Sequence, residues 1–173
     1  SHVAHMAAGD FYGSEKSATL ANAGSLKITF HGKDGSTVVL KEKTAVKAGE
    51  IVDAAVMSRK ALAAFIGEQI ADAKAQGVLF SLHLKATMMK VSDPIMFGVA
   101  VNEFYKDVLA KHADVLKQAG FDANNGIGDL AARLPSLPEA TRAAIEADLA
   151  AEYAQRPGVA MVNSDKGITN LHV

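Results

Sequence analysis

The chain has 173 residues, 49% of them apolar and 21% charged, and a net charge of −1. These values predict one globular domain with a packed core and give no indication of binding to nucleic acid or to an anionic membrane surface. The absence of cysteine excludes disulfide bonds and thiolate chemistry and favours a cytoplasmic location, and no apolar run approaches the roughly 20 residues that span a bilayer.

The first part of the chain predicts a hairpin after an irregular start. Residues 1–24 are mostly small and polar, and we expect an irregular lead-in there. From Leu26 to Phe30 apolar and polar residues alternate, which is the period of a strand with one buried face. The pair Asp34-Gly35 favours the left-handed geometry of a tight turn. An antiparallel hairpin is therefore expected over residues 25–41.

Residues 58–119 predict a helix, a buried strand and a second helix. Ser58 is a good N-cap for the first helix, and Gly77 occupies the position of a C-terminal glycine. The short apolar run Val78–Leu84 is typical of a strand that is buried on both faces. Asp93-Pro94 then supplies a cap and a proline in the first helical position, and we expect this second helix to run unbroken to about residue 119.

The last part predicts a loop, a helix and a strand. Residues 121–137 are rich in glycine, asparagine and proline, and we expect a connecting loop with at most one helical turn. Ser136 and Glu139 have the spacing of a capping box, which predicts a helix to about Gln155. Its buried stripe is expected to be thin, and consists of Ala143, Leu149 and Tyr153. A short strand at 159–162 completes a helix–strand unit over residues 136–173.

The order of these elements predicts the fold class. Strands that alternate with helices are typical of an α/β protein. We expect a mixed sheet flanked by helices, with the first hairpin as an antiparallel addition. No internal repeat or low-complexity segment indicates another architecture.

Lys85 is the first candidate for chemistry. It follows the predicted buried strand directly, and a lysine that loses solvation has a lowered pKa and can exchange protons. The alternative is a lysine whose stem packs while its ammonium group reaches solvent. Lys90 is expected to be a solvated loop charge.

Other motifs carry less chemistry. The six histidines show no spacing of three or four converging ligands, so no dedicated metal site is expected. The stretch Asn125–Asp129 lacks the third glycine of a dinucleotide fingerprint and predicts a turn. The cluster Asn163–Gly167 could bind a small polar ligand, although such clusters are usually turns.

Four blocks of the sequence are long enough to indicate a family: SHVAHM at residues 1–6, DFYGSEK at 10–16, HLKATMMKVSDPIMFG within 78–98, and AMVNSDKGITNLHV at 160–173. Together they resemble the monomeric NADP-dependent isocitrate dehydrogenases along nearly the whole chain. The resemblance implies that residues 1–173 form a segment of the large domain of an isocitrate/isopropylmalate dehydrogenase-like fold.

The same resemblance implies a reaction and a catalytic residue. The family converts isocitrate and NADP to 2-oxoglutarate, carbon dioxide and NADPH with magnesium or manganese. Within the pattern Lys85–Lys90, Lys85 corresponds to the lysine that transfers a proton during oxidative decarboxylation. Thr87 corresponds less specifically to a residue lining the substrate. No cofactor-binding residue is assigned within this chain.

The chain also departs from the family. Family members are about four times longer, and their substrate motif, metal-binding aspartates and NADP-binding residues lie outside the matching segment. Ala131 stands where relatives often have an aromatic residue. The segment is therefore expected to be inactive alone, without a metal site or bound cofactor of its own. The alternative is a non-catalytic folding or assembly module that self-associates as a homodimer through exposed strands.

Overall fold

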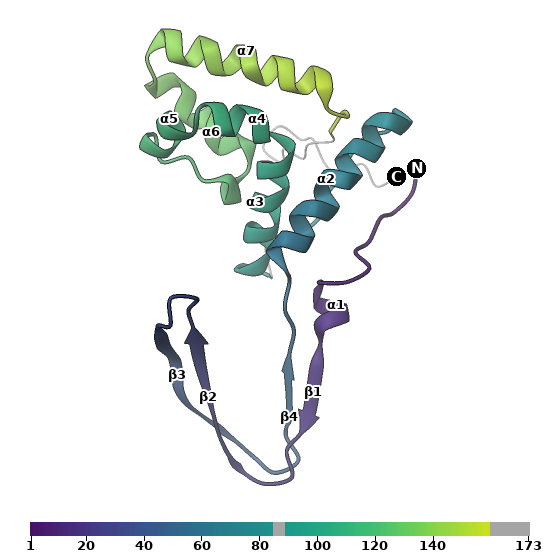
Figure 1. Cartoon of the computed structure of the whole chain (residues 1–173), viewed down its shortest axis with the longest axis vertical. Coiled ribbons are helices and arrows are strands. Elements are labelled where there is room, and N and C mark those ends of the chain that lie inside the picture. Colours follow the sequence, from purple (N-terminus) through teal and green to yellow (C-terminus); the bar gives the residue numbers. More distant parts are fainter. Residues whose placement is uncertain (85–88, 160–173) are drawn as a thin grey trace. The chain divides into compact units, whose positions relative to one another are not determined.

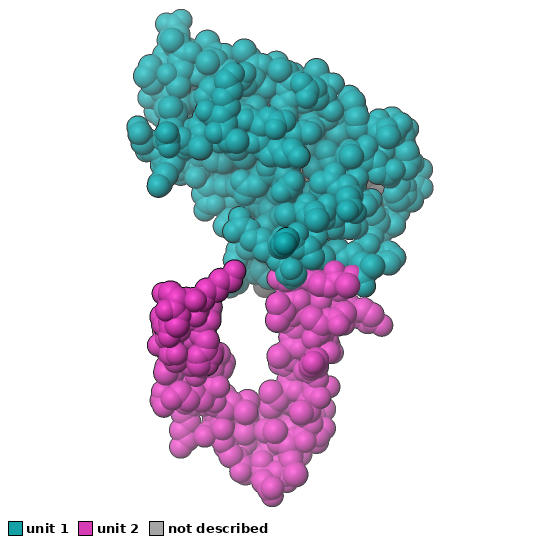
Figure 2. All heavy atoms as spheres, in the orientation of Figure 1, with its two compact units in different colours: residues 1–7, 58–173 teal, residues 8–57 magenta. Residues whose placement is uncertain are grey.

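The computed structural model describes residues 1–84 and 89–159, and the chain divides into two compact units. Figure 2 colours the strand unit (residues 8–57) and the helical unit (residues 1–7 and 58–173) separately. The single domain expected from chain length stays a prediction. Within the strand unit Val46 is the one buried residue, so this unit has almost no core of its own.

The strand unit begins with regular structure where an irregular lead-in was expected over residues 1–24. The one-turn helix α1 (Phe11–Ser14) is capped by Asp10, whose Oδ1 accepts a hydrogen bond from the Gly13 amide at 3.0 Å. Strand β1 (Lys16–Thr19) pairs antiparallel with β4 (Ile51–Ala54), as Figure 1 shows. The expectation is wrong because the partner of β1 lies more than thirty residues further along the chain, where no local pattern reveals it.

The hairpin is present and longer than expected. Strand β2 (Gly24–His31) pairs antiparallel with β3 (Thr37–Val46), and Gly35 adopts φ +80° in the connecting turn. Two register shifts near Ile28 interrupt the regular ladder. The expected buried face is wrong: the side chains of Ile28 and Phe30 are both exposed. A two-stranded ribbon has no layer of its own to cover either face.

The helical unit starts with the helix that the caps predicted. Helix α2 (Arg59–Gln76) begins after Ser58, whose Oγ accepts a hydrogen bond from the Ala61 amide, and it ends at Gly77 in the left-handed region with φ +65°. Its buried side chains are those of Leu62, Ile66, Ile70 and Ala73. This face packs beside α3 (Ser92–Phe104), the next helix along the chain (Figure 1).

The strand expected at Val78–Leu84 is reduced to one bridge. Phe80 forms an isolated parallel bridge with Val159, and its amide donates to the Gly158 carbonyl at 2.8 Å. Leu79 is 66% exposed, so the segment is not buried on both faces. An apolar run predicts burial only when sheet neighbours flank it. In the described chain, Val159 is the sole bridge partner of this segment, and residues 160–162 of the other predicted strand lie outside the description.

The second helix is broken twice. It is expected to run unbroken from Asp93-Pro94, but α3 ends at Phe104, α4 spans Lys106–Lys111 and α5 spans Ala113–Gln118. Tyr105 and His112 separate them, each with φ −108°. The expected cap is also wrong: α3 begins at Ser92, and Pro94 lies third in the helix. Proline is tolerated there because the first-turn amides have no partner within the helix.

Residues 121–137 contain far more helix than the expected loop. They form a 3₁₀ turn at Ala123–Asn125, helix α6 (Ile127–Arg133) and a second 3₁₀ turn at Leu134–Ser136. The stretch Asn125–Asp129, expected as a turn, thus contains the start of α6. Short helices are marginal alone and depend on tertiary contacts, which composition does not reveal.

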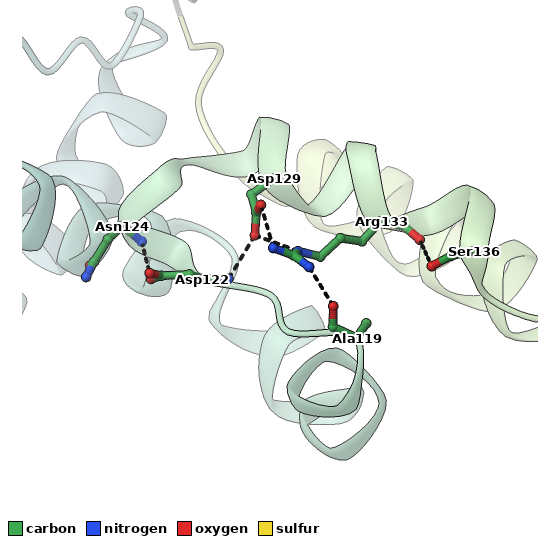
Figure 3. Close-up of polar contacts among 6 residues, drawn as sticks. All are labelled: Ala119, Asp122, Asn124, Asp129, Arg133 and Ser136. Atoms are coloured by element: carbon green, nitrogen blue, oxygen red, sulfur yellow. Dashed lines mark hydrogen bonds and ion pairs between the residues drawn. The ribbon is translucent and has the colours of Figure 1, made fainter.

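Arg133 supplies those contacts (Figure 3). Its guanidinium donates to both carboxylate oxygens of Asp129 at 2.9 and 3.0 Å and to the Ala119 carbonyl at 2.7 Å. The same carboxylate accepts from the Asp122 amide at 2.9 Å, and the hydrogen bonds from Arg133 lower the pKa of Asp129. This network ties α6 to the end of α5.

Helix α7 (Glu139–Gln155) contacts α4 and is drawn above α4, α5 and α6 in Figure 1. The expected capping box is wrong, because the Ser136 hydroxyl donates to the Arg133 carbonyl and no side chain caps the helix. The expected stripe is largely wrong as well. Ala143 and Tyr153 are exposed and Leu149 is half-buried, whereas Ile145 and Glu152 are buried. Ile145 joins a core cluster made with Val108, Leu116, Leu130 and Leu134.

Gly98 marks the closest approach of α3 to the 3₁₀ turn at Ala123–Asn125. A Cβ at Gly98 would overlap the Asn124 side chain and would lie 3.1 Å from the Asn124 amide nitrogen. We expect Gly98→Ala to destabilise the helical unit by about 1–3 kcal/mol, the usual cost of overpacking. Urea denaturation followed by circular dichroism at 222 nm measures this change.

Gly128 is the matched control for this substitution. It lies in α6 with no atom within 4 Å of its added Cβ. Gly128→Ala should therefore stabilise the chain by about 0.4–1 kcal/mol, because alanine restricts the unfolded chain without a clash. Equal stabilities of the two variants would contradict the close approach at Gly98.

Candidate functional site

The principal sequence candidates lie outside the described residues. Lys85 and Thr87 fall within 85–88, and the turn Asn163–Gly167 falls within 160–173. Lys90 is described and exposed, as expected for a loop charge. What the structure does describe is the backbone that leads into Lys85, namely Val78–Leu84, and the elements packed against it.

An apolar hollow of about 110 Å³ lies against this leading segment. It is lined by Phe80 and Leu82, by Val159 from the paired segment, and by apolar side chains of α3 and α6. Phe80 is five residues before Lys85 and Leu82 is three residues before it. The hollow thus contacts the described backbone that comes just before the candidate lysine in the sequence.

Two tyrosines meet beside this hollow. The hydroxyl of Tyr105 lies 2.9 Å from that of Tyr153, and the two rings are in edge contact. The pKa of Tyr105 is raised mainly by burial and, to a smaller extent, by the hydrogen bond with Tyr153. Tyr105 is therefore protonated at neutral pH and joins α7 to the break between α3 and α4.

An ion pair between a buried carboxylate and a half-buried guanidinium lies at the same break. Glu152 and Arg156 are one helical turn apart at the end of α7, and the Arg156 Nη2 donates to the Glu152 Oε1 at 2.6 Å. Arg156 also donates from Nε to the carbonyl of Phe104, the last residue of α3, at 2.9 Å. Glu152 accepts from the Val108 amide at 3.0 Å in the first turn of α4.

This pair complements both helix ends at once. The guanidinium lies at the carbonyl end of α3 and the carboxylate lies at the amide end of α4, which is the favourable sign at each terminus. The sequence analysis missed this pair, although the spacing Glu152–Arg156 is a signal for an ion pair on a helix. Periodicity alone gave no reason to place either side chain inside.

A histidine and a lysine form a second cluster one turn earlier on the same face of α7. The Asp148 carboxylate accepts from Lys111 at 2.8 Å and lies 2.6 Å from the His112 Nε2. These contacts, with Lys111 first, lower the pKa of Asp148. The cluster connects α7 to the break between α4 and α5. Because it contains only one carboxylate, we interpret it as a structural contact between helices.

The described residues show no cluster of metal ligands, and the hollow beside Phe80 does not fit a dinucleotide. Among residues 1–84 and 89–159, no three histidine, aspartate or glutamate side chains converge as metal ligands. The hollow beside Phe80 is smaller than the roughly 300–1,000 Å³ of small-molecule and cofactor pockets. Arg133 and Arg156 are both engaged in ion pairs. Within the same described ranges, no helix has the length and apolarity to cross a bilayer.

Comparison with known proteins identifies the family. The model of the monomeric isocitrate dehydrogenase family matches residues 1–173. The chain is 69% identical over 173 residues to an isocitrate dehydrogenase [NADP] of Azotobacter vinelandii and 61% identical over 173 residues to isocitrate dehydrogenase [NADP] 2 of Colwellia maris. It is 48% identical over 171 residues to isocitrate dehydrogenase [NADP] 2 of Mycobacterium tuberculosis.

These matches cover 99–100% of the chain and 23% of each relative, so the chain spans about a quarter of the length of the curated relatives it matches. The match includes the leading segment Val78–Leu84, the candidate lysine after it and both units of the fold. The chain belongs to the monomeric isocitrate dehydrogenase family.

Proposed function

We propose that the protein containing this chain catalyses the NADP-dependent oxidative decarboxylation of isocitrate to 2-oxoglutarate in the cytoplasm. The observation that carries the proposal is the family match over residues 1–173, together with high identity to relatives named as NADP-dependent isocitrate dehydrogenases. The mixed α/β composition of the described residues agrees with a segment of a large domain of the isocitrate/isopropylmalate dehydrogenase type.

Within this proposal Lys85 transfers a proton at the reacting centre and Thr87 lines the substrate. A lysine suits this role because desolvation lowers its pKa toward the working pH. NADP is the electron acceptor, and magnesium or manganese is the metal of the complete enzyme. The family resemblance implies that the residues binding both groups lie in parts of the enzyme outside this chain, and no step is derived through them.

The isolated 173-residue chain is expected to be inactive. The full-length enzyme should reduce NADP in the presence of isocitrate and Mg²⁺, which is measured as absorbance of NADPH at 340 nm. The purified 173-residue chain should give no signal above a blank without isocitrate under the same conditions. Turnover in the isolated chain that is lost in its Lys85→Ala variant would refute this expectation.

A second candidate function is supported by the strand unit. Ile28 and Phe30 on β2 and Val38, Val39 and Leu40 on β3 are all exposed, and unpaired strand edges favour pairing with another chain. The segment could then serve as an assembly module that forms a homodimer. Sedimentation equilibrium discriminates the two: a strict monomer at high concentration contradicts the dimer, and the enzyme proposal is unaffected by either result.

A further inference from the structure

The segment leading into Lys85 and the segment leaving α7 are constrained together. The first leaves α2 at Gly77 and the second leaves α7 after Gln155, and the two meet in parallel at the bridge between Phe80 and Val159. The Phe80 amide donates to the Gly158 carbonyl at 2.8 Å. A Cβ added at Gly158 would lie 2.8 Å from the end of the Leu79 side chain, so the glycine leaves room for that side chain beside the bridge.

Lys74 joins the two helices at the points where these segments begin. Its ammonium group, in the last turn of α2, donates to the carbonyls of Ala154 and Arg156 at 3.0 and 3.1 Å. Those carbonyls are at the end of α7, where a cation is favourable. Lys74 is three residues before Gly77, the point where the segment toward Lys85 starts. Its contacts therefore fix the end of α7 close to the start of that segment.

The Glu152–Arg156 pair also holds the same end of α7. Its contacts with the Phe104 carbonyl and the Val108 amide tie α7 to the break between α3 and α4. The Glu152 side chain is 3% exposed, and among the described residues every buried side-chain nitrogen and oxygen has a hydrogen-bond partner. A fully satisfied buried network is rigid, since each lost partner leaves a desolvated group.

We propose that Arg156, with Glu152 and Lys74, positions the Phe80–Leu84 backbone, the segment that directly precedes Lys85 in the chain. The three side chains set where α7 ends, the end of α7 sets where Gly158 and Val159 lie, and these residues pair with Phe80. They act through backbone pairing and touch no reacting group, so they are positioning residues. The catalytic consequence rests on the proposed function, whereas the effect on Phe80 does not.

The test uses the full-length enzyme and a matched pair of variants. Arg156→Met removes an ion pair with Glu152 at i, i+4 spacing, a second and more exposed ion pair with Asp107, and a contact with a helix-end carbonyl. Arg133→Met removes an ion pair of the same spacing and a contact with the Ala119 carbonyl, but it lies away from the Phe80–Val159 bridge. Lys74→Met is a milder second variant, because Lys74 is exposed and its loss leaves the buried pair intact.

Two measurements are made on each variant. Hydrogen exchange at the Phe80 amide, corrected for global stability, should accelerate about tenfold or more in Arg156→Met and Lys74→Met, as expected for losing charge-assisted hydrogen bonds. It should stay at the wild-type rate in Arg133→Met. In the same enzymes kcat should fall about tenfold with little change in the KM for isocitrate, because misplacement of a catalytic group affects the chemical step. The conservative variant Arg156→Lys should restore part of the protection of the Phe80 amide and part of kcat.

The outcomes separate the two proposals. Equal exchange at Phe80 in all three methionine variants, or a fall in stability with unchanged Phe80 exchange and kcat, overturns the positioning role. Absence of isocitrate turnover in the wild-type enzyme, or full activity of Lys85→Ala, instead overturns the proposed function. In that case the exchange at Phe80 still decides whether the network positions this segment.

Discussion

Replacing Lys85 by alanine in the full-length enzyme is expected to lower kcat for isocitrate oxidation by about 100- to 10,000-fold, the usual contribution of a positioned general acid or base. Alanine removes the group that exchanges the proton, while isocitrate and NADP keep their other contacts. The KM values should therefore change much less than kcat. Initial rates of NADPH formation at saturating substrates measure the effect.

Lys90 provides the control for charge. It lies five residues further along the same stretch and is exposed. Lys90→Ala removes the same formal charge from the same segment, and its kcat should stay near that of the wild type. A Lys85→Ala enzyme as active as Lys90→Ala would remove Lys85 from the mechanism and would leave the family assignment standing.

The Ile145→Ala variant is expected to lose about 2–5 kcal/mol of unfolding free energy, the range for truncating a large buried aliphatic side chain. Ile145 is 0% exposed and packs among Val108, Leu116, Leu130 and Leu134. Alanine would leave a cavity at the contact of α7 with the helices beneath it. Since domains have only about 5–15 kcal/mol of stability in total, the loss should shift the urea midpoint strongly.

Ile95 supplies a matched control for this prediction. It is also an isoleucine in a helix of the same unit, but it is 50% exposed. Ile95→Ala makes the same chemical change with the same gain in helix propensity, and surface substitutions usually change stability by about 0.5 kcal/mol or less. If both variants lost the same free energy, the burial of Ile145 at the centre of this cluster would be wrong.

Short-range patterns predicted the elements whose signals lie within a few residues. The Ser58 cap and Gly77 marked both ends of α2, and the Asp34-Gly35 turn marked the hairpin. The same kind of reasoning failed for α7, where Ala143 and Tyr153 were expected inside and Ile145 was overlooked. In an alanine-rich helix several faces are almost equally apolar, so the neighbouring helices select the buried one.

The residues of the candidate site likewise include one that the sequence predicted and two that it did not. Lys85 was identified from its place after an apolar run and from the family resemblance, and its role stays a prediction. Glu152 and Arg156 were overlooked because charged residues on a helix are usually solvated. Their burial depends on partners at Phe104 and Val108, more than forty residues earlier in the chain.

The amino-acid sequence was therefore sufficient for the family, the hairpin, the capped helix α2 and the candidate lysine, because these depend on residue identity or on contacts between near neighbours. The breaks at Tyr105 and His112, the helical character of residues 123–136 and the burial of Glu152 came from the fold. Each of them depends on hydrogen bonds or packing between segments distant in sequence. A carboxylate is buried and a guanidinium is half-buried at the end of α7 because two other helix ends supply the groups that satisfy them.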